Sequence, residues 1–169
     1  MTKLISPRLN RRLRPAGLMA LIISAALVAF AQGRPAVKVQ LNGAVDRAGK
    51  EVALADAKAV GPGEVLRWTV LSLNEGQAPA LNYQTTAPVP KGTAYVLGSA
   101  SGELSPQITF SIDGGRAYSA QPMIPERQPD GSTKMVPAPA SSYTHVRFQW
   151  AASLAASNSV KAYYSTRVK

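Results

Sequence analysis

The sequence predicts an all-β domain, a β-sandwich with Greek-key connections, and three observations predict it. Apolar and polar residues alternate with period two along most of the chain after residue 36, and no stretch keeps a helical period for three turns. Gly and Pro, at 13 residues each, fall between the alternating runs, as is typical of turns. About eight or nine short runs in one chain of this size favour a sandwich.

The first residues have the three parts of a secretory signal peptide. Five Lys and Arg residues and no acidic residue precede an apolar run, Leu18 to Phe30, and an A-x-A sequence ends at Ala31. We expect cleavage between Ala31 and Gln32, so that residues 1–31 are targeting sequence and residues 32–169 are one exported domain without a membrane span. The run of 13 residues, apolar except for Ser24, is too short to cross a bilayer. An uncleaved N-terminal anchor is the alternative. The pair Arg11-Arg12 also leaves export by the twin-arginine route open.

The first half of the exported domain contains four alternating runs. Strands are expected at 37–41, 65–73, 81–86 and 93–97. Asn42-Gly43 follows the first of them and is expected to turn the chain. Pro88 and Pro90 lie between the last two, and since proline donates no hydrogen bond, this segment is expected to connect two sheets or to lie at an edge.

The second half continues the pattern around two turn sequences. Strands are expected at 108–112, 116–119, 144–150 and 160–168. Asp113-Gly114-Gly115 tolerates positive φ and predicts a hairpin between the first two strands. Residues 121–142 contain five prolines around Asp130-Gly131-Ser132, and they are predicted to form a long, exposed, Pro-rich loop. Such a loop is an ordinary surface feature, although binding functions often lie on loops of this length.

The alternation divides each strand into a core face and a wet face. The residues predicted to share one core are Trp68, Val70, Val146, Phe148, Trp150 and Tyr164. If the last two strands pair with each other, the polar face gathers a basic strip of His145, Arg147, Lys161, Arg167 and Lys169. We expect the arginines of this strip to lie in water. The strip is a candidate interaction face, and the alternative is that its charges protect a sheet edge.

The residue inventory argues against most catalytic chemistry. Cys is absent and His occurs once, so zinc sites built from Cys and His, thiol catalysis and disulfides are excluded. Residues 98–102 resemble G-x-S-x-G, but their central residue is Ala100, so no nucleophile is predicted. The nine carboxylates are scattered, although two of them could still meet as a glycosidase pair. We therefore predict no enzyme, no cofactor and no metal site.

The basic composition does not indicate a nucleic-acid partner. Five of the 19 Lys and Arg residues belong to the targeting segment, which leaves +5 of the formal +10 on the exported domain. No run of Lys and Arg remains there to follow a phosphate backbone. The sequence therefore predicts no nucleic-acid binding.

Several short motifs of the exported domain resemble the bacterial surface "conserved repeat domain", also called domain of unknown function eleven. The opening G-E-V-L-R-W-T-V at 63–70, with N-E-G at 74–76, is similar to the start of that family, and Asn82, P-K-G at 90–92 and Tyr95-Val96 follow in the same order. The sequences S-I-D-G-G at 111–115 and H-V-R-F at 145–148 continue the resemblance. It extends from about Val37 to Lys169.

The resemblance implies an immunoglobulin-like sandwich in an exported or envelope-associated protein with no established activity. Two departures from the family pattern are Ala87 and Val89, where the family has Asp and Leu. One copy stands alone here, which argues against a spacer in a long stalk. We therefore predict a structural or interaction module of the cell envelope, located in the periplasm, the envelope or outside the cell. The alternatives are a binding protein for acidic envelope glycan and a periplasmic assembly factor that acts by edge-strand addition.

Overall fold

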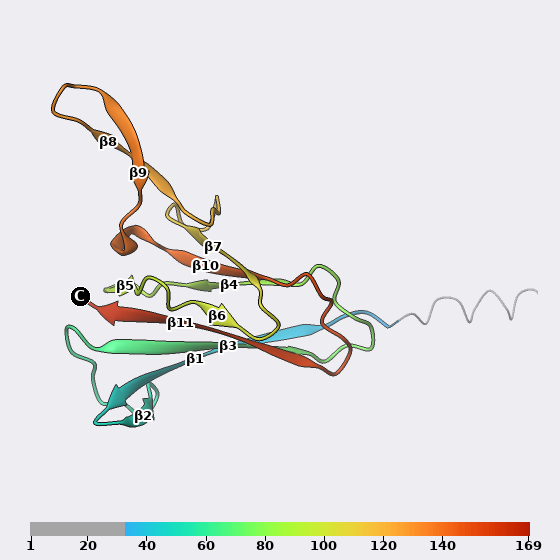
Figure 1. Cartoon of the computed structure of the whole chain (residues 1–169). Helices are drawn as coiled ribbons and strands as arrows, with labels where there is room; N and C mark the ends of the chain where they lie inside the picture. Colours follow the sequence, from blue (N-terminus) through green and yellow to red (C-terminus); the bar gives the residue numbers. More distant parts are fainter. Residues whose placement is uncertain (1–32) are drawn as a thin grey trace, which may run out of the picture. The chain divides into compact units, whose positions relative to one another are not determined.

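The computed structural model describes residues 33–169, and these residues form an all-β, immunoglobulin-like sandwich (Figure 1). The fold class predicted from alternation and turn residues is therefore confirmed. The predicted cleavage site between Ala31 and Gln32 lies outside the described residues.

Two antiparallel sheets pack face to face. The larger has the order β2-β1-β3-β11-β5, with β6 also paired to β11, and the smaller has the order β4-β10-β7. The larger sheet contains β1 (Val37–Arg47), β2 (Lys50–Ala53), β3 (Val65–Asn74), β5 (Thr93–Tyr95), β6 (Ser101–Gly102) and β11 (Ser159–Val168). The smaller contains β4 (Gln84–Pro88), β7 (Gln107–Ser111) and β10 (His145–Gln149). The chain changes sheet after β3, β4, β6 and β10, which are Greek-key connections.

The core lies between the two sheets, as the alternation predicted. Five of the six predicted core residues are buried in one cluster, and the sixth, Trp68, is partly buried against it. The Trp68 ring stacks on Tyr164, and its indole N–H donates to Thr166 Oγ1 at 2.9 Å. The Tyr164 hydroxyl donates to the Pro88 carbonyl at 2.6 Å, which joins β11 to β4 across the core. Burial of Tyr164 raises the pKa of its phenol.

The first strand is longer than predicted, because Asn42-Gly43 does not turn the chain. β1 continues through Gly43 to Arg47, and the turn follows at Ala48-Gly49, where both residues have positive φ. Gly43 is required for packing instead. A Cβ at this position would lie 2.7 Å from Trp68 Cζ3, too close for any side chain.

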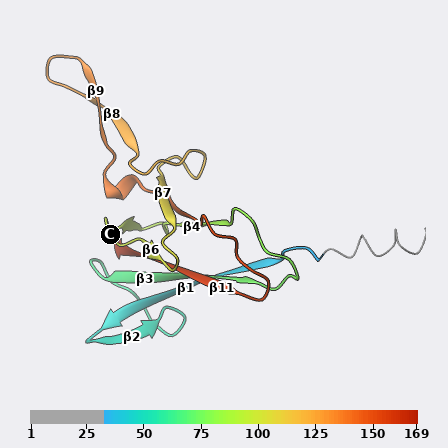
Figure 2. The same ribbon diagram turned by 45° about the vertical axis from the view of Figure 1, so that its right-hand side comes forward.

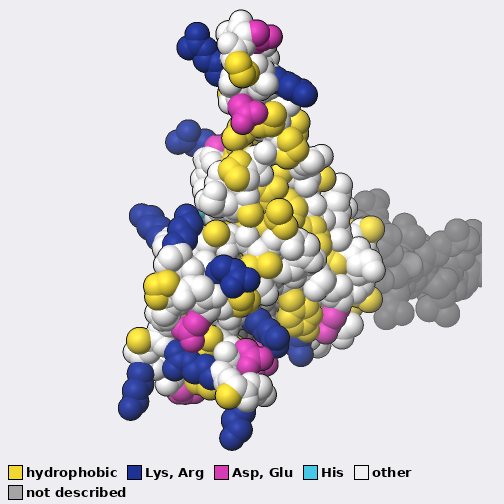
Figure 3. All heavy atoms as spheres, turned by 60° about the vertical axis from the view of Figure 1, so that its left-hand side comes forward, with side chains coloured by type: hydrophobic (Ala, Val, Ile, Leu, Met, Phe, Trp, Pro, Cys, Tyr) yellow, Lys and Arg dark blue, Asp and Glu magenta, His cyan; other side chains and the backbone are white. Residues whose placement is uncertain are grey.

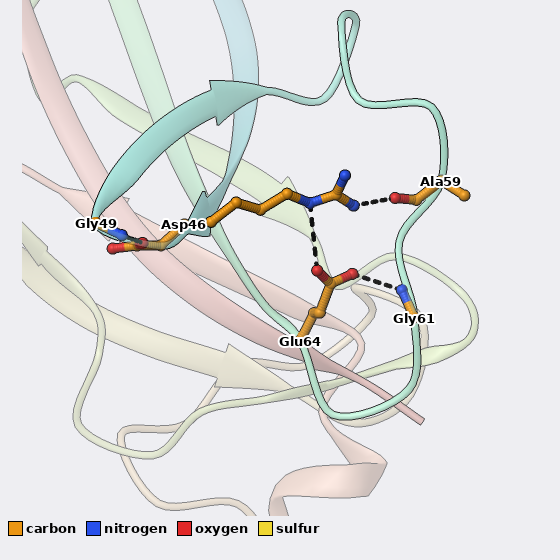
Figure 4. A network of polar contacts seen from close by, with 6 residues as sticks. Asp46, Gly49, Ala59, Gly61 and Glu64 are labelled. Carbon is orange, nitrogen blue, oxygen red and sulfur yellow. Dashed lines mark hydrogen bonds and ion pairs between the residues drawn. The ribbon is translucent and has the colours of Figure 1, made fainter.

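A polar network fixes the connection between β2 and β3 against the end of β1 (Figure 4). The Glu64 carboxylate lies 3.4 Å from the Arg47 guanidinium and accepts a 2.5 Å hydrogen bond from the Gly61 N–H. Arg47 also donates to the Ala59 carbonyl. The connection is thus held at the Arg47 end of β1, where β2 also pairs, and not along the first half of the strand.

The segment predicted to be a Pro-rich loop is a β-hairpin, and that prediction is wrong. β8 (Met123–Arg127) pairs with β9 (Thr133–Pro137), and the short 3-10 helix η1 (Ala140–Ser142) returns the chain to β10. We call this hairpin the arm, because it projects away from the sandwich in both views (Figures 1 and 2). Its tip is a turn with Pro129 at the second position, closed by Gly131 at positive φ.

Candidate interaction surface

The predicted basic strip does not exist as one surface, because β10 and β11 are not neighbours. β10 pairs with β4 and β7 in the smaller sheet, whereas β11 pairs with β3, β5 and β6 in the larger one. Phe148 of β10 and Tyr164 of β11 are buried in the same core, so the buried faces of the two strands face each other. The two polar faces therefore lie on opposite sides of the sandwich, which separates His145 and Arg147 from the three cations of the last strand.

The β11 half of the strip is exposed. Lys161, Arg167 and Lys169 all lie in solvent, and the Arg167 guanidinium donates to the Gly63 carbonyl at 2.8 Å. Glu103 adjoins this face, since its carboxylate accepts the Lys161 backbone N–H at 2.9 Å. Binding of an acidic ligand by these three residues stays a prediction.

The β10 half is partly covered by an aromatic ring. The Arg147 guanidinium carbon lies 3.4 Å from the centre of the Tyr118 ring, and Arg147 Nε is buried without a hydrogen-bond partner. The expectation that Arg147 lies in water is therefore wrong, because the electron-rich face of Tyr118 takes the place of solvent on that side of the cation. His145 lies beside this pair, with Nδ1 3.2 Å from Thr144 Oγ1.

The turn after β7 holds Tyr118 over Arg147. The Asp113 carboxylate accepts backbone N–H groups from Ala117 and Arg116 at about 3.0 Å, and the Ser111 hydroxyl donates to it at 2.7 Å. These bonds, that from Ala117 first, lower the pKa of Asp113. The hairpin predicted at Asp113-Gly114-Gly115 is present, although its second strand is reduced to a single bridge between Phe110 and Ser119.

A shallow hollow of about 330 Å³ lies between this turn and the base of the arm. Its lining residues include Phe110, Ile112, Ala117, Tyr118, Pro122 and Met123. Asp113 also borders the hollow, but its carboxylate is already occupied by the turn. The hollow therefore offers a mainly apolar surface next to the Tyr118–Arg147 pair.

The arm has two different faces. In an antiparallel pair, directly opposite residues lie on the same face, so Met123 and Pro137 share one face with Pro125 and Met135. All four are exposed, Met123 at 40% and Met135 at 54%. The other face carries Glu126 and Lys134 near the tip, and Ile124 and Val136, both partly buried, nearer the base.

The apolar arm face and the hollow meet at Met123, which belongs to both. Hydrophobic side chains gather where the arm leaves the sandwich (Figure 3). We call this continuous region the arm surface; its central residues are Tyr118, Met123, Pro125, Met135 and Pro137. The arm surface was not predicted from the sequence. The alternation of Met and Pro on both sides of Asp130-Gly131 was the available signal, but five prolines in one segment favoured a loop.

Comparison of the chain with family models, with curated proteins and with solved structures gives no match. The resemblance to the conserved repeat domain therefore stays a prediction. Within residues 33–169 no cluster of three His, Cys, Asp or Glu side chains is placed to hold a metal ion. No helix of the described part of the chain is long and apolar enough to cross a membrane.

Proposed function

We propose that the chain is an exported, non-enzymatic, immunoglobulin-like module that binds a protein of the cell envelope through the arm surface. The observation that carries this proposal is the continuity of the exposed Met and Pro face of the arm with the hollow at its base. Apolar regions of this kind on a folded domain are typical of binding sites, because their burial in a complex releases water from apolar area.

The residue types of the arm surface favour a protein partner. Met123 and Met135 have flexible, polarizable side chains that adapt to irregular apolar surfaces. Tyr118 adds an aromatic ring held in place by Arg147, and rigid aromatic anchors dominate binding energy at many protein interfaces. An apolar side chain of the partner fits the hollow, while the arm lies along the surface around it.

Photo-cross-linking in intact producing cells tests this proposal. A photoreactive amino acid at position 135 is expected to capture one envelope protein. The matched control is position 134, which is one residue away on the opposite face of the arm and is also exposed. Capture of the same protein at both positions, or capture only at 134, would contradict a role for the Met and Pro face. The variant Met135→Glu is expected to abolish capture by a reporter placed at Met123, whereas Lys134→Glu leaves it unchanged.

A second candidate function is binding of an acidic envelope glycan through β11. Its support is the exposed group Lys161, Arg167 and Lys169, which lies on one face of one strand and its C-terminal end. Retention on an acidic glycan is expected to fall as salt is raised, because the Debye length shortens to about 8 Å at physiological ionic strength. Arg167→Glu should weaken such retention, and Arg147→Glu should not, since Arg147 lies on the other sheet. Retention that does not change with salt concentration would exclude this function.

A further inference from the structure

The first half of β1 has a free edge among the described residues. β2 pairs with β1 only from Ala44 to Arg47, and one further bond joins Leu54 N–H to the Gly43 carbonyl. On the other side, the Glu75 N–H donates to the Ala36 carbonyl, so the even-numbered residues of β1 bond to β3. The odd-numbered residues therefore direct their N–H and C=O groups away from β3. At Val37, Val39 and Leu41 no strand of residues 33–169 meets them.

Two of these three residues, Val39 and Leu41, also expose apolar side chains, whereas Val37 is partly buried against the core. Val39 is 47% exposed and Leu41 39%, although the β3 residues paired with them, Ser72 and Val70, are fully buried. The core therefore does not extend over β1 at Val39 and Leu41. Backbone groups and apolar side chains are thus left open together at one margin of the sandwich.

This margin lacks the features that usually protect an edge strand. Residues 37–41 contain no proline, and β1 pairs with β3 without a bulge there. The one charge in this stretch, Lys38, lies 3.8 Å from Glu75. The segment is therefore nearly neutral in a domain that carries a formal charge of +5 after removal of the five basic residues of the targeting segment.

We propose that a second copy of this chain pairs antiparallel with β1 at this margin, with Val39 on the two-fold axis. Val39 then faces Val39 of the partner subunit, and Val37 faces Leu41 of the partner subunit. Because all three are outward-bonding positions, each such pair exchanges two hydrogen bonds, about six in all. The apolar side chains Val37, Val39 and Leu41 form one continuous row across the axis.

The same register suits the polar face. Lys38 comes opposite Gln40 of the partner subunit, so no two like charges are placed directly across the interface. A two-fold arrangement of this kind is closed, because each copy uses its only free β1 edge on the other. The two larger sheets then join into one continuous sheet, and further copies are not added at this edge.

Single-cysteine variants of the exported protein test the partner and the register together. The chain has no Cys, so any disulfide identifies the introduced residue. Paired outward-bonding residues have Cα atoms about 5.5 Å apart, within the range that a disulfide spans. Val39→Cys is expected to give a disulfide-linked dimer on mild oxidation. Val37→Cys alone should not, whereas a mixture of Val37→Cys and Leu41→Cys should give the mixed dimer.

Equal cross-linking of all three single variants would contradict the register, and a monomeric Val39→Cys protein after oxidation would contradict the pairing. A second measurement, sedimentation equilibrium of the cysteine-free protein, is expected to show a dimer in the micromolar range. Val39→Glu places two carboxylates across the axis and should convert it to a folded monomer, while Val39→Thr keeps the dimer. A cysteine-free protein that stays monomeric, or capture of a different extended chain by Cys-directed reagents at position 39, would overturn the proposal.

Discussion

Two regions of this molecule expose strand edges, and they differ in where their prolines lie. In the arm, Pro125 and Pro137 occupy paired strands, yet neither costs a hydrogen bond of the hairpin. The Ala138 N–H donates to the Pro122 carbonyl and the Gln128 N–H to the Ser132 carbonyl, so the even-numbered residues of the arm bond across it. The two prolines are odd-numbered, and the N–H groups that they lack would point outward. In β1 the outward positions are Val37, Val39 and Leu41.

A proline's phase within a strand therefore matters more than its presence. At an outward position, proline keeps the hairpin intact and removes the donor that another strand would use. The arm can therefore expose an apolar face for a partner while each of its two edges has one outward donor fewer. The β1 margin exposes apolar side chains and keeps its outward donors, which is why strand pairing is proposed there and side-chain binding is proposed for the arm.

The largest expected effect is the loss of stability when a side chain of the core between the two sheets is removed. Phe148 is fully buried between the sheets, and Phe148→Ala should lower the free energy of unfolding by about 3–5 kcal/mol. Gln149→Ala, one residue further along the same strand, is exposed and should cost under about 0.5 kcal/mol. Chemical unfolding followed by Trp fluorescence measures both. Equal losses would mean that the strand register is shifted by one residue.

The next effect tests the phase argument within β1. Gln40→Pro removes an N–H that bonds to β3 and leaves a carbonyl of that strand without its donor, at a cost of about 1–3 kcal/mol. Val39→Pro removes only an outward N–H and should cost under about 1 kcal/mol, the span of strand propensities. Both are measured by chemical unfolding at the same low protein concentration, so that association does not contribute. A larger loss for Val39→Pro would reverse the assigned phase.

The sequence predicted which side chains of each strand face the core, but not which strands are neighbours. Alternation assigned Val146, Phe148 and Tyr164 to the core, and all three are buried there. Period two contains no information on pairing, however. The last two strands are adjacent in the chain and lie in different sheets, so the expected basic strip was divided between two surfaces.

The arm surface was missed for a related reason. The five prolines between 121 and 142 predict a loop, although in a hairpin every second N–H is not used. The contact between Tyr118 and Arg147 joins the turn after β7 to strand β10, and no local pattern indicates it. Both features depend on tertiary neighbours, which the spacing of one chain does not reveal.

Replacing the two outward prolines of the arm should give it a strand edge like that of β1. The double variant Pro125→Val and Pro137→Val restores two outward N–H groups while keeping an apolar face. The free energy of global unfolding should change by under about 0.5 kcal/mol, because both sites are exposed. Sedimentation should show concentration-dependent association beyond that of the unaltered protein. Pro129→Ala, at the tip and outside the ladder, is the control and should show no added association. Identical behaviour of the two variants would mean that the prolines do not protect the arm.

The smallest expected effect is the pH dependence of stability from two carboxylates, Asp113 in the body and Asp130 in the arm. Hydrogen bonds lower the pKa of Asp113, chiefly that from the Ala117 N–H, and the pKa of Asp130, chiefly those from Ser132. A carboxylate whose pKa is lower in the folded state stabilises that state above its unfolded pKa of about 4, and the contribution is lost as the pH falls through the folded pKa.

The turn closed by Asp113 is bonded to the sandwich, because its Gly114 N–H donates to Thr144 Oγ1 beside β10. Asp130 lies at the tip of the arm, which makes few contacts with the body and should open before the core does. Asp113→Asn should therefore lower the free energy of unfolding at pH 7. This difference should shrink as the pH falls below about 4 toward the lowered pKa of Asp113, whereas Asp130→Asn should not change the free energy of unfolding at any of these pH values. Trp fluorescence during chemical unfolding reports the core. If Asp130→Asn shifts that transition as much as Asp113→Asn, the arm folds as one cooperative unit with the sandwich, and the β1 margin and the arm differ only in their edges.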